Sequence, residues 1–242
     1  MKKNVTKIGI ALFALLFLQT SAYAITGFGW LKGSGKIISE TRELGSFHSL
    51  KVGGAFEVIL IKATKEKIVL EVDDNLMPYI TTKTFGGVLE IDNEKEFRNP
   101  TRLKAIVYYV SIDELTISGA AELSSEDVLK SADLEIEASG ASEVVLQLDT
   151  DLLDAEISGA SQLKLSGRAT VVIAEASGAS DYIALELEAD SYDMDASGAS
   201  HAKIWVNSKL NLEASGASSV LYKGNPSIDI IDLSGASSVK KY

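Results

Sequence analysis

The sequence predicts an all-β fold, built as a right-handed parallel β-solenoid of about 19-residue coils with SGAS corners. Two observations lead to this prediction. The tetrad Ser-Gly-Ala-Ser, with Ser-Gly-Ala-Ala as its first instance, recurs at near-constant intervals through the second half of the chain. Apolar and polar residues alternate on both sides of each tetrad, which is the pattern of half-buried strands.

Residues 1–24 predict a secretory signal peptide, not a part of the fold. A basic segment, MKKNVTK, precedes an apolar run from Ile8 to Leu18 that is too short to cross a membrane. Ala22-Tyr23-Ala24 then supplies the small residues of a cleavage site. We expect an exported protein of the periplasm or of the extracellular cell envelope, with no transmembrane segment after cleavage.

The remaining chain, residues 25–242, is strongly acidic. Without Lys2, Lys3 and Lys7 it has 20 basic and 34 acidic residues, a net charge near −14. This balance argues against nucleic acid and anionic lipid as partners, because both select clustered Lys and Arg. The chain has no Cys, so burial and backbone hydrogen bonds must supply its stability.

Three further regions follow the signal peptide. Residues 25–36 predict a flexible leader, and residues 37–117 predict a β-rich N-terminal part that packs on or continues the solenoid and caps it. Within that part, Phe47 to Leu60 resembles a degenerate coil with GGAF in place of SGAS. Two hairpins are expected, one turning at Thr64-Lys65-Glu66 and one at Gly86-Gly87.

Residues 118–242 predict the regular solenoid. Its tetrads begin at Ser118, Ser139, Ser158, Ser177, Ser197, Ser215 and Ser234, which are 18 to 21 residues apart. Helical repeats are longer and carry a different period. Two short strands of about 19 residues per coil cannot bury their own apolar faces, so successive coils must stack with equivalent strands paired in parallel.

Each coil is expected to read strand, corner, strand, corner. Apolar residues stand one and three positions before the tetrads, and five positions before most of them, as Ala138, Ile136 and Leu134 do before Ser139; Asp229 breaks the last of these columns. The second corner is predicted at turn formers such as Asp149-Thr150-Asp151 and Ser166-Gly167-Arg168. In the tetrad, Gly is expected at positive φ, Ala inside a narrow corner, and Ser bonded to backbone or to the next coil.

Groups that carry chemistry are scarce. The only histidines, His48 and His201, stand far apart, and neither has metal-ligand spacing. His201 follows a tetrad where equivalent positions hold Glu143, Gln162, Asp181 and Ser219, so we interpret it as outward variation and expect no catalytic residue. No phosphate-binding loop is present, because neither Gly-x-Gly run continues as the required motif.

An acidic column is the sharpest candidate site. The residue two positions before each tetrad is acidic in six coils: Glu137, Glu156, Glu175, Asp195, Glu213 and Asp232. Stacked at about 5 Å these carboxylates repel one another unless cations or solvent intervene. The column therefore suggests a weak Ca²⁺ site, to which Glu135, Asp154 and Asp193 could add ligands, or else a charged face that prevents aggregation.

The run GSGKIISETRELGSFHSLKVGGAFEVIL, followed by serial tetrads, resembles the bacterial family described as putative auto-transporter adhesin, head GIN domain. The resemblance covers about residues 33–242. It implies a β-helical fold, export from the cytoplasm and an adhesive or carbohydrate-contacting role. It supplies no catalytic or binding residues.

These observations favour a non-enzymatic, adhesin-like module of the cell envelope whose solenoid faces contact a glycan or a protein. The alternative is a polysaccharide-active β-helix enzyme of the calcium-assisted lyase type, which needs a basic residue such as Arg168 beside carboxylates. A third interpretation is a scaffold whose ends stack. The last coil, ending in SVKKY, shows no polar cap, so we expect either homo-oligomer formation through this coil or its protection by Lys240, Lys241 and Tyr242.

Overall fold

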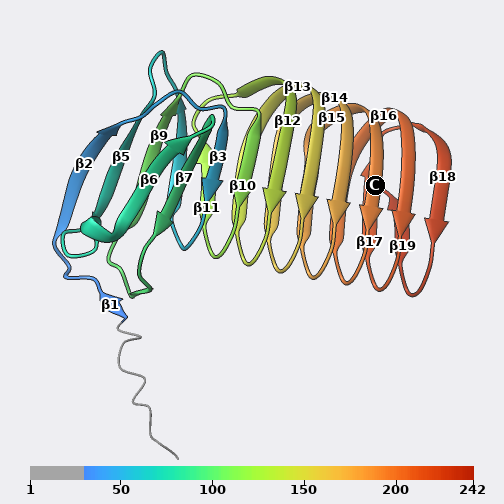
Figure 1. Cartoon of the computed structure of the whole chain (residues 1–242). Coiled ribbons are helices and arrows are strands. Elements are labelled where there is room, and N and C mark those ends of the chain that lie inside the picture. The colour runs from blue at the N-terminus through green and yellow to red at the C-terminus, as the bar shows by residue number, and fades with distance from the viewer. Residues whose placement is uncertain (1–29) are drawn as a thin grey trace, which may run out of the picture. The chain divides into compact units, whose positions relative to one another are not determined.

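The computed structural model describes residues 30–242, so the predicted signal peptide and residues 25–29 of the predicted leader lie outside the described residues. The described chain confirms the predicted fold class. Its strands form a right-handed parallel β-solenoid of about 7 turns, with about 19 residues between equivalent positions (Figure 1). Within this part of the chain no helix is long and apolar enough to span a bilayer.

Every regular coil contributes to two sheets. Sheet 1 contains the segments that lead into the tetrads and sheet 2 those that leave them. In sheet 1 these are β10 (Glu114–Ile117), the second halves of β12 (Leu129–Ala138), β13 (Glu143–Ile157), β14 (Gln162–Ala176), β15 (Asp181–Ala196) and β16 (His201–Ala214), and β18 (Ser227–Leu233). In sheet 2 they are β11 (Glu122–Ser125), the first halves of β13 to β16, β17 (Ser219–Lys223) and β19 (Ser238–Lys241).

The second corner differs from the prediction. β13, β14, β15 and β16 bend through their turn-forming residues without a break, whereas Gly224-Asn225-Pro226 separates β17 from β18. Backbone pairing continues across the bend, as between Asp149 and Arg168. Because the neighbouring coil satisfies these backbone groups, the chain changes direction there without leaving the ladder.

The N-terminal part extends both sheets of the solenoid. β3 (Ser49–Val52) pairs with β10, and β4 (Glu57–Lys62) pairs with β11, both in parallel. The coil with GGAF is therefore a true coil. The next outward coil is made by β7 (Val88–Asn93) and β9 (Leu103–Tyr109), which pair in parallel with β3 and β4. The order along the chain therefore differs from the order in space. The coil of β3 and β4 comes first in the chain, but the later coil of β7 and β9 lies outside it, and β10 and β11 pair on its other side.

Antiparallel strands close this end. β6 (Ile80–Phe85) pairs with β7 and confirms the predicted hairpin at Gly86-Gly87. The other predicted hairpin is wrong, because β9 lies between β4 and β5 (Lys67–Asp73) and pairs with both. Parallel pairing of β4 with the equivalent strand of the next coil replaces the local pairing. β2 (Ile37–Glu43) completes the edge beside β5.

Two side chains secure the N-terminal end. The Arg42 guanidinium donates to the Ile80 carbonyl oxygen at 2.9 Å, and so links β2 to β6. Asp73, fully buried, accepts hydrogen bonds from the Gly35 and Thr101 backbone N–H groups, each at 2.7 Å. Burial alone raises a carboxyl pKa, but these hydrogen bonds and the one from Arg102 N–H hold the pKa of Asp73 below its ordinary value. The stability that they supply at neutral pH is lost as the pH falls through that lowered pKa.

The same contacts attach part of the predicted leader. β1 (Leu31–Lys32) pairs in parallel with β8 (Phe97–Arg98), and the Ser34 hydroxyl donates to Asp74 Oδ1 at 2.7 Å. From Leu31 onward this segment is held against the fold, and the buried Asp73 explains why.

The core is a single column of inward side chains between the sheets. The three predicted apolar positions before the tetrads are buried in all regular coils from β12 to β16. In β18 the equivalent residues Ile231 and Leu233 are 41% and 45% exposed. Two other apolar residues of this strand, Ile228 and Ile230, are 44% and 50% exposed. In the described chain β18 pairs on one side only, with β16.

The tetrad glycines stack into a continuous column. Their φ angles lie between 69° and 79°, and each following Ala N–H donates to the glycine carbonyl one coil earlier at 2.7 to 2.8 Å. A Cβ on any of these glycines would lie 2.4 to 2.6 Å from that carbonyl oxygen. Glycine is therefore required for two reasons. The backbone at this position is left-handed, and the coils approach too closely for a side chain.

The tetrad serines bond to the backbone as predicted, but they and not the alanines occupy the inward position. The alanines, such as Ala160 and Ala179, are exposed, whereas the second serines, such as Ser161 and Ser218, are buried. The Ser161 hydroxyl donates to the Ser158 carbonyl oxygen at 2.7 Å. The predicted inward Ala is thus wrong: the inward position needs a small side chain that also satisfies a corner carbonyl, which Ser provides.

We expect Gly178→Ala to destabilise the fold by more than about 2 kcal/mol, because it adds left-handed strain and a clash with the Gly159 carbonyl oxygen. Gly86→Ala is the matched control, since Gly86 has φ 60° but no atom within 4 Å of the place that an alanine methyl would take. It should cost only about 1 kcal/mol. Urea unfolding measures both; equal losses would show that coil contact at the glycine column contributes nothing.

Candidate functional faces

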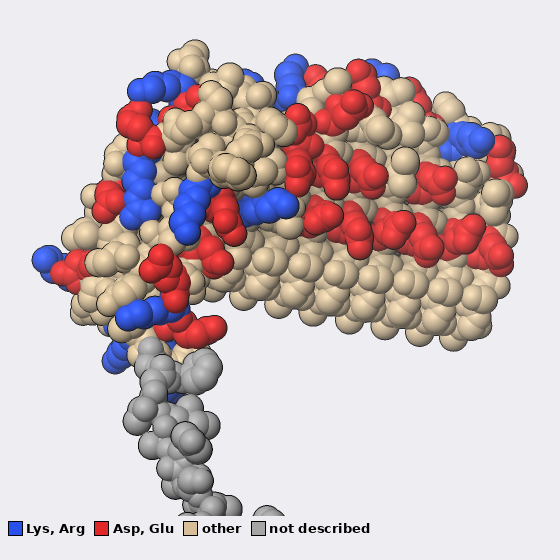
Figure 2. All heavy atoms as spheres, in the orientation of Figure 1, with Lys and Arg blue, Asp and Glu red and all other residues tan. Residues whose placement is uncertain are grey.

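The six predicted acidic residues form one row across sheet 1. Register pairing joins the neighbours in order, from Glu137 and Glu156 to Glu213 and Asp232, and all six side chains are exposed. Figure 2 shows this acidic row running along the solenoid, above an uncharged strip that the tetrad corners form. The structure thus brings together the residues that the sequence singled out.

A second acidic row lies two positions earlier on the same strands. Glu114, Glu135 and Asp154 are register neighbours on β10, β12 and β13. Ile173 then interrupts the row, Asp193 resumes it, and the uncharged Asn211 follows in register. Desolvation raises the pKa of Glu135 above its ordinary value, and the carboxylates of Glu114, Glu137 and Asp154 raise it further. Glu135 therefore opposes folding at neutral pH, and this penalty is relieved as the pH falls through its raised pKa.

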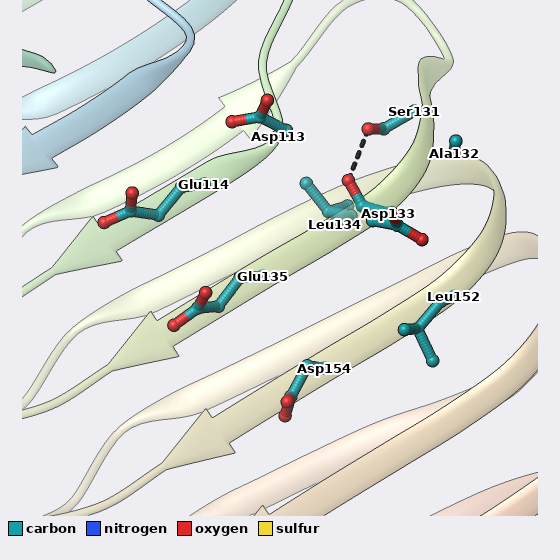
Figure 3. A pocket seen from close by; sticks show the side chains of 9 residues that line it. All are labelled: Asp113, Glu114, Ser131, Ala132, Asp133, Leu134, Glu135, Leu152 and Asp154. Carbon is teal, nitrogen blue, oxygen red and sulfur yellow. Dashed lines mark hydrogen bonds between the residues drawn. The ribbon is translucent and has the colours of Figure 1, made fainter. Parts of the chain in front are cut away.

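A shallow recess of about 540 Å³ lies at the N-terminal end of these rows. Asp113, Glu114, Asp133, Glu135 and Asp154 line it, together with Leu134 and Leu152 (Figure 3). The carboxylates project from successive strands and do not converge on one point. Among residues 30–242, no three His, Cys, Asp or Glu side chains are grouped so as to hold a metal ion. The two interpretations of the column, a weak Ca²⁺ site or a charged face that prevents aggregation, both stay predictions.

The two histidines lie on outer surfaces. His48 Nδ1 lies 2.9 Å from Asp113 Oδ1 beside the recess, a contact that no sequence spacing indicates. His201 Nδ1 lies 3.8 Å from Asp181 Oδ1 on the preceding strand of sheet 2. Arg168, the basic residue of the enzyme alternative, lies in register between Asp149 and Glu188 at the bend.

The family model described as "Putative auto-transporter adhesin, head GIN domain" matches residues 46–226. No curated protein matches the chain. Several solved structures share the fold, and each of the three described below covers 88% of this chain. One is a putative adhesin from Bacteroides fragilis, with 21% identity, a TM-score of 0.82 and 100% of that chain covered.

Two others come from Parabacteroides. A putative adhesin from Parabacteroides merdae has 20% identity, a TM-score of 0.72 and 98% of its chain covered. A putative lipid binding protein from Parabacteroides distasonis has 15% identity, a TM-score of 0.74 and 100% of its chain covered. At these identities the likeness concerns the fold alone.

The acidic row predicts that salt stabilises this protein. We expect its melting temperature to rise with NaCl, because screening weakens the repulsion between stacked carboxylates. Glu156→Lys combined with Asp195→Lys should raise the melting temperature by a few degrees at low salt and reduce the salt effect, since each Lys then lies between two acids.

The charge-matched control is Glu94→Lys combined with Glu96→Lys. These two exposed carboxylates lie in the loop that joins β7 to β8, outside the acidic row. The control makes the same change in net charge, so it should leave most of the salt effect in place. An equal loss of the salt effect in both variants would assign it to net charge and not to the row.

Calcium distinguishes the two interpretations of the row. At matched ionic strength, CaCl₂ should stabilise the protein no more than NaCl does. A larger rise in melting temperature with Ca²⁺ that is lost in the Glu156→Lys, Asp195→Lys variant would contradict the interpretation that salt acts by screening alone. It would establish a cation site.

Proposed function

Because the chain belongs to the family described as putative auto-transporter adhesin, head GIN domain, we propose that it is an exported, non-enzymatic binding module of the bacterial cell envelope. The family and two of the three similar structures reported above are described as putative adhesins. The finer proposal is that the flat outer faces of the solenoid contact a glycan or a protein directly.

The in-register rows of side chains carry this proposal. On both sheets one side chain type is repeated or alternated from coil to coil, as with the six acids of sheet 1. Such rows present many weak contacts at a fixed spacing, which suits an extended or polymeric partner better than a small molecule. The recess beside Glu135 is shallow and open, and it fits surface contact as well.

A glycan and protein array tests this function. Beads coated with residues 25–242 should show saturable binding to at least one glycan or surface protein, well above beads coated with serum albumin. Absence of binding throughout the array would contradict the proposal. Incubation with uronate polymers, followed by ultraviolet absorbance, should give no unsaturated product; its formation would favour the lyase alternative.

Self-association is a second proposal, supported by β18. Four apolar side chains of this strand, Ile228, Ile230, Ile231 and Leu233, are 41% to 50% exposed. An exposed strand with apolar side chains is a template for pairing with another copy. Light scattering of residues 25–242 should show concentration-dependent association, and Ile231→Lys with Leu233→Lys should abolish it. A monomer at all concentrations would contradict the proposal.

A further inference from the structure

The outer face of sheet 2 carries a row with a two-coil period. Its members alternate between apolar and cationic side chains: Val145, Lys164, Ile183, Lys203, Leu221 and Lys240. Each is the register neighbour of the next, on β13, β14, β15, β16, β17 and β19. We call this the alternating row. Since strands lie about 4.8 Å apart, its lysines recur at about 10 Å along the solenoid axis.

The three lysines of the alternating row are exposed and take part in none of the ion pairs found among residues 30–242. Two other coil lysines do form such pairs, Lys130 with Asp149 and Lys209 with Asp229. In a chain with 34 acidic residues, three such lysines in one line are a separate feature of the surface.

The surroundings strengthen the positive charge toward the C-terminal coils. In the described β16, β17 and β19, the outward positions on sheet 2 include no Asp or Glu; they are His201, Lys203, Trp205, Ser219, Leu221, Lys223, Ser238 and Lys240. Lys223 Nζ lies 3.6 Å from the centre of the Trp205 ring and adds a fourth cation beside the row. Asn207 holds the indole in place by accepting its Nε1–H at 3.1 Å.

Net acidity does not exclude an anionic partner on this face. The acidic row lies on the outer side of the opposite sheet, and packed sheets are about 10 Å apart. The outward side chains of the two sheets point away from each other, so the path between them through solvent is longer than the Debye length of about 8 Å at physiological salt, and the lysines set the potential in the solvent beside them. Acids flank the N-terminal half of the row on both sides, as Glu143 and Asp181 on one side and Glu186 and Glu188 on the other. Glu188 is also the register neighbour of Trp205 and accepts a hydrogen bond from Asn207 Nδ2 at 2.8 Å.

We propose that the alternating row binds a linear acidic polysaccharide that carries one anionic group per disaccharide. The chain would lie along the solenoid axis, with carboxylates on the lysines and the less polar sugar faces on Val145, Ile183 and Leu221. A disaccharide of an extended chain is close in length to the two-coil period. Nucleic acid fits less well, because one strand places a charge about every 3.4 Å and would leave two of every three phosphates without a lysine. This inference rests on the proposed binding function and specifies one face and one ligand class.

Hyaluronan is the probe, because it is linear and has one carboxylate per disaccharide. We expect residues 25–242 to bind immobilised hyaluronan in a salt-dependent manner and not to bind carboxyl-reduced hyaluronan. Lys164→Gln, Lys203→Gln and Lys240→Gln together should weaken binding about tenfold or more, since each exposed ion pair contributes modestly. Lys83→Gln, Lys130→Gln and Lys209→Gln together are the charge-matched control and should bind as the unaltered protein does.

Circular dichroism melting confirms that both variants fold. Equal binding by the two variants, or no binding of hyaluronan by the unaltered protein, would overturn the inference. Equal or tighter binding to polyphosphate or to anionic phosphatidylglycerol vesicles would also overturn it, by showing a general anion surface. If hyaluronan fails while the bead array still gives a ligand, this inference is wrong and the proposed binding function stands.

Discussion

Backbone pairing between consecutive coils is the constraint on which the rest of this structure depends. At each corner the Ala N–H donates to the glycine carbonyl of the preceding coil, at 2.7 to 2.8 Å, and this contact fixes the register. The glycine column permits it, because a side chain at that position would meet the same carbonyl. Once the register is fixed, every residue has a defined neighbour one coil away, inside the core and on the surface.

Register converts a local sequence choice into a surface property. An acid two positions before each tetrad becomes a continuous row on sheet 1 (Figure 2). Lysines at every second coil become the alternating row on sheet 2. The net charge of the whole chain therefore does not indicate the charge of either face. A solenoid can thus present an acidic face that limits aggregation and, on the opposite side, a face suited to an anionic polymer.

The regular coils could be predicted from the sequence because period and alternation are local signals. The acidic column and the buried apolar positions follow from them directly. Other features depend on contacts between distant segments. β9 displaces the hairpin expected between β4 and β5, and the buried Asp73 binds the segment around Gly35. The alternating row could have been predicted from the sequence, because each of its lysines stands at the same position after its tetrad. The contact of Lys223 with the Trp205 ring could not, because no local pattern indicates it.

Register along the solenoid is the central claim, and one distance tests it most directly. Glu143 and Ser238 are connected by five register steps, through Gln162, Asp181, His201 and Ser219. The chain has no Cys, so Glu143→Cys with Ser238→Cys allows two spin labels to be attached specifically. Pulsed electron paramagnetic resonance should give a narrow distribution centred at about 24 Å, which is five strand spacings. A broad distribution, or a centre displaced by a full coil spacing, would contradict the account.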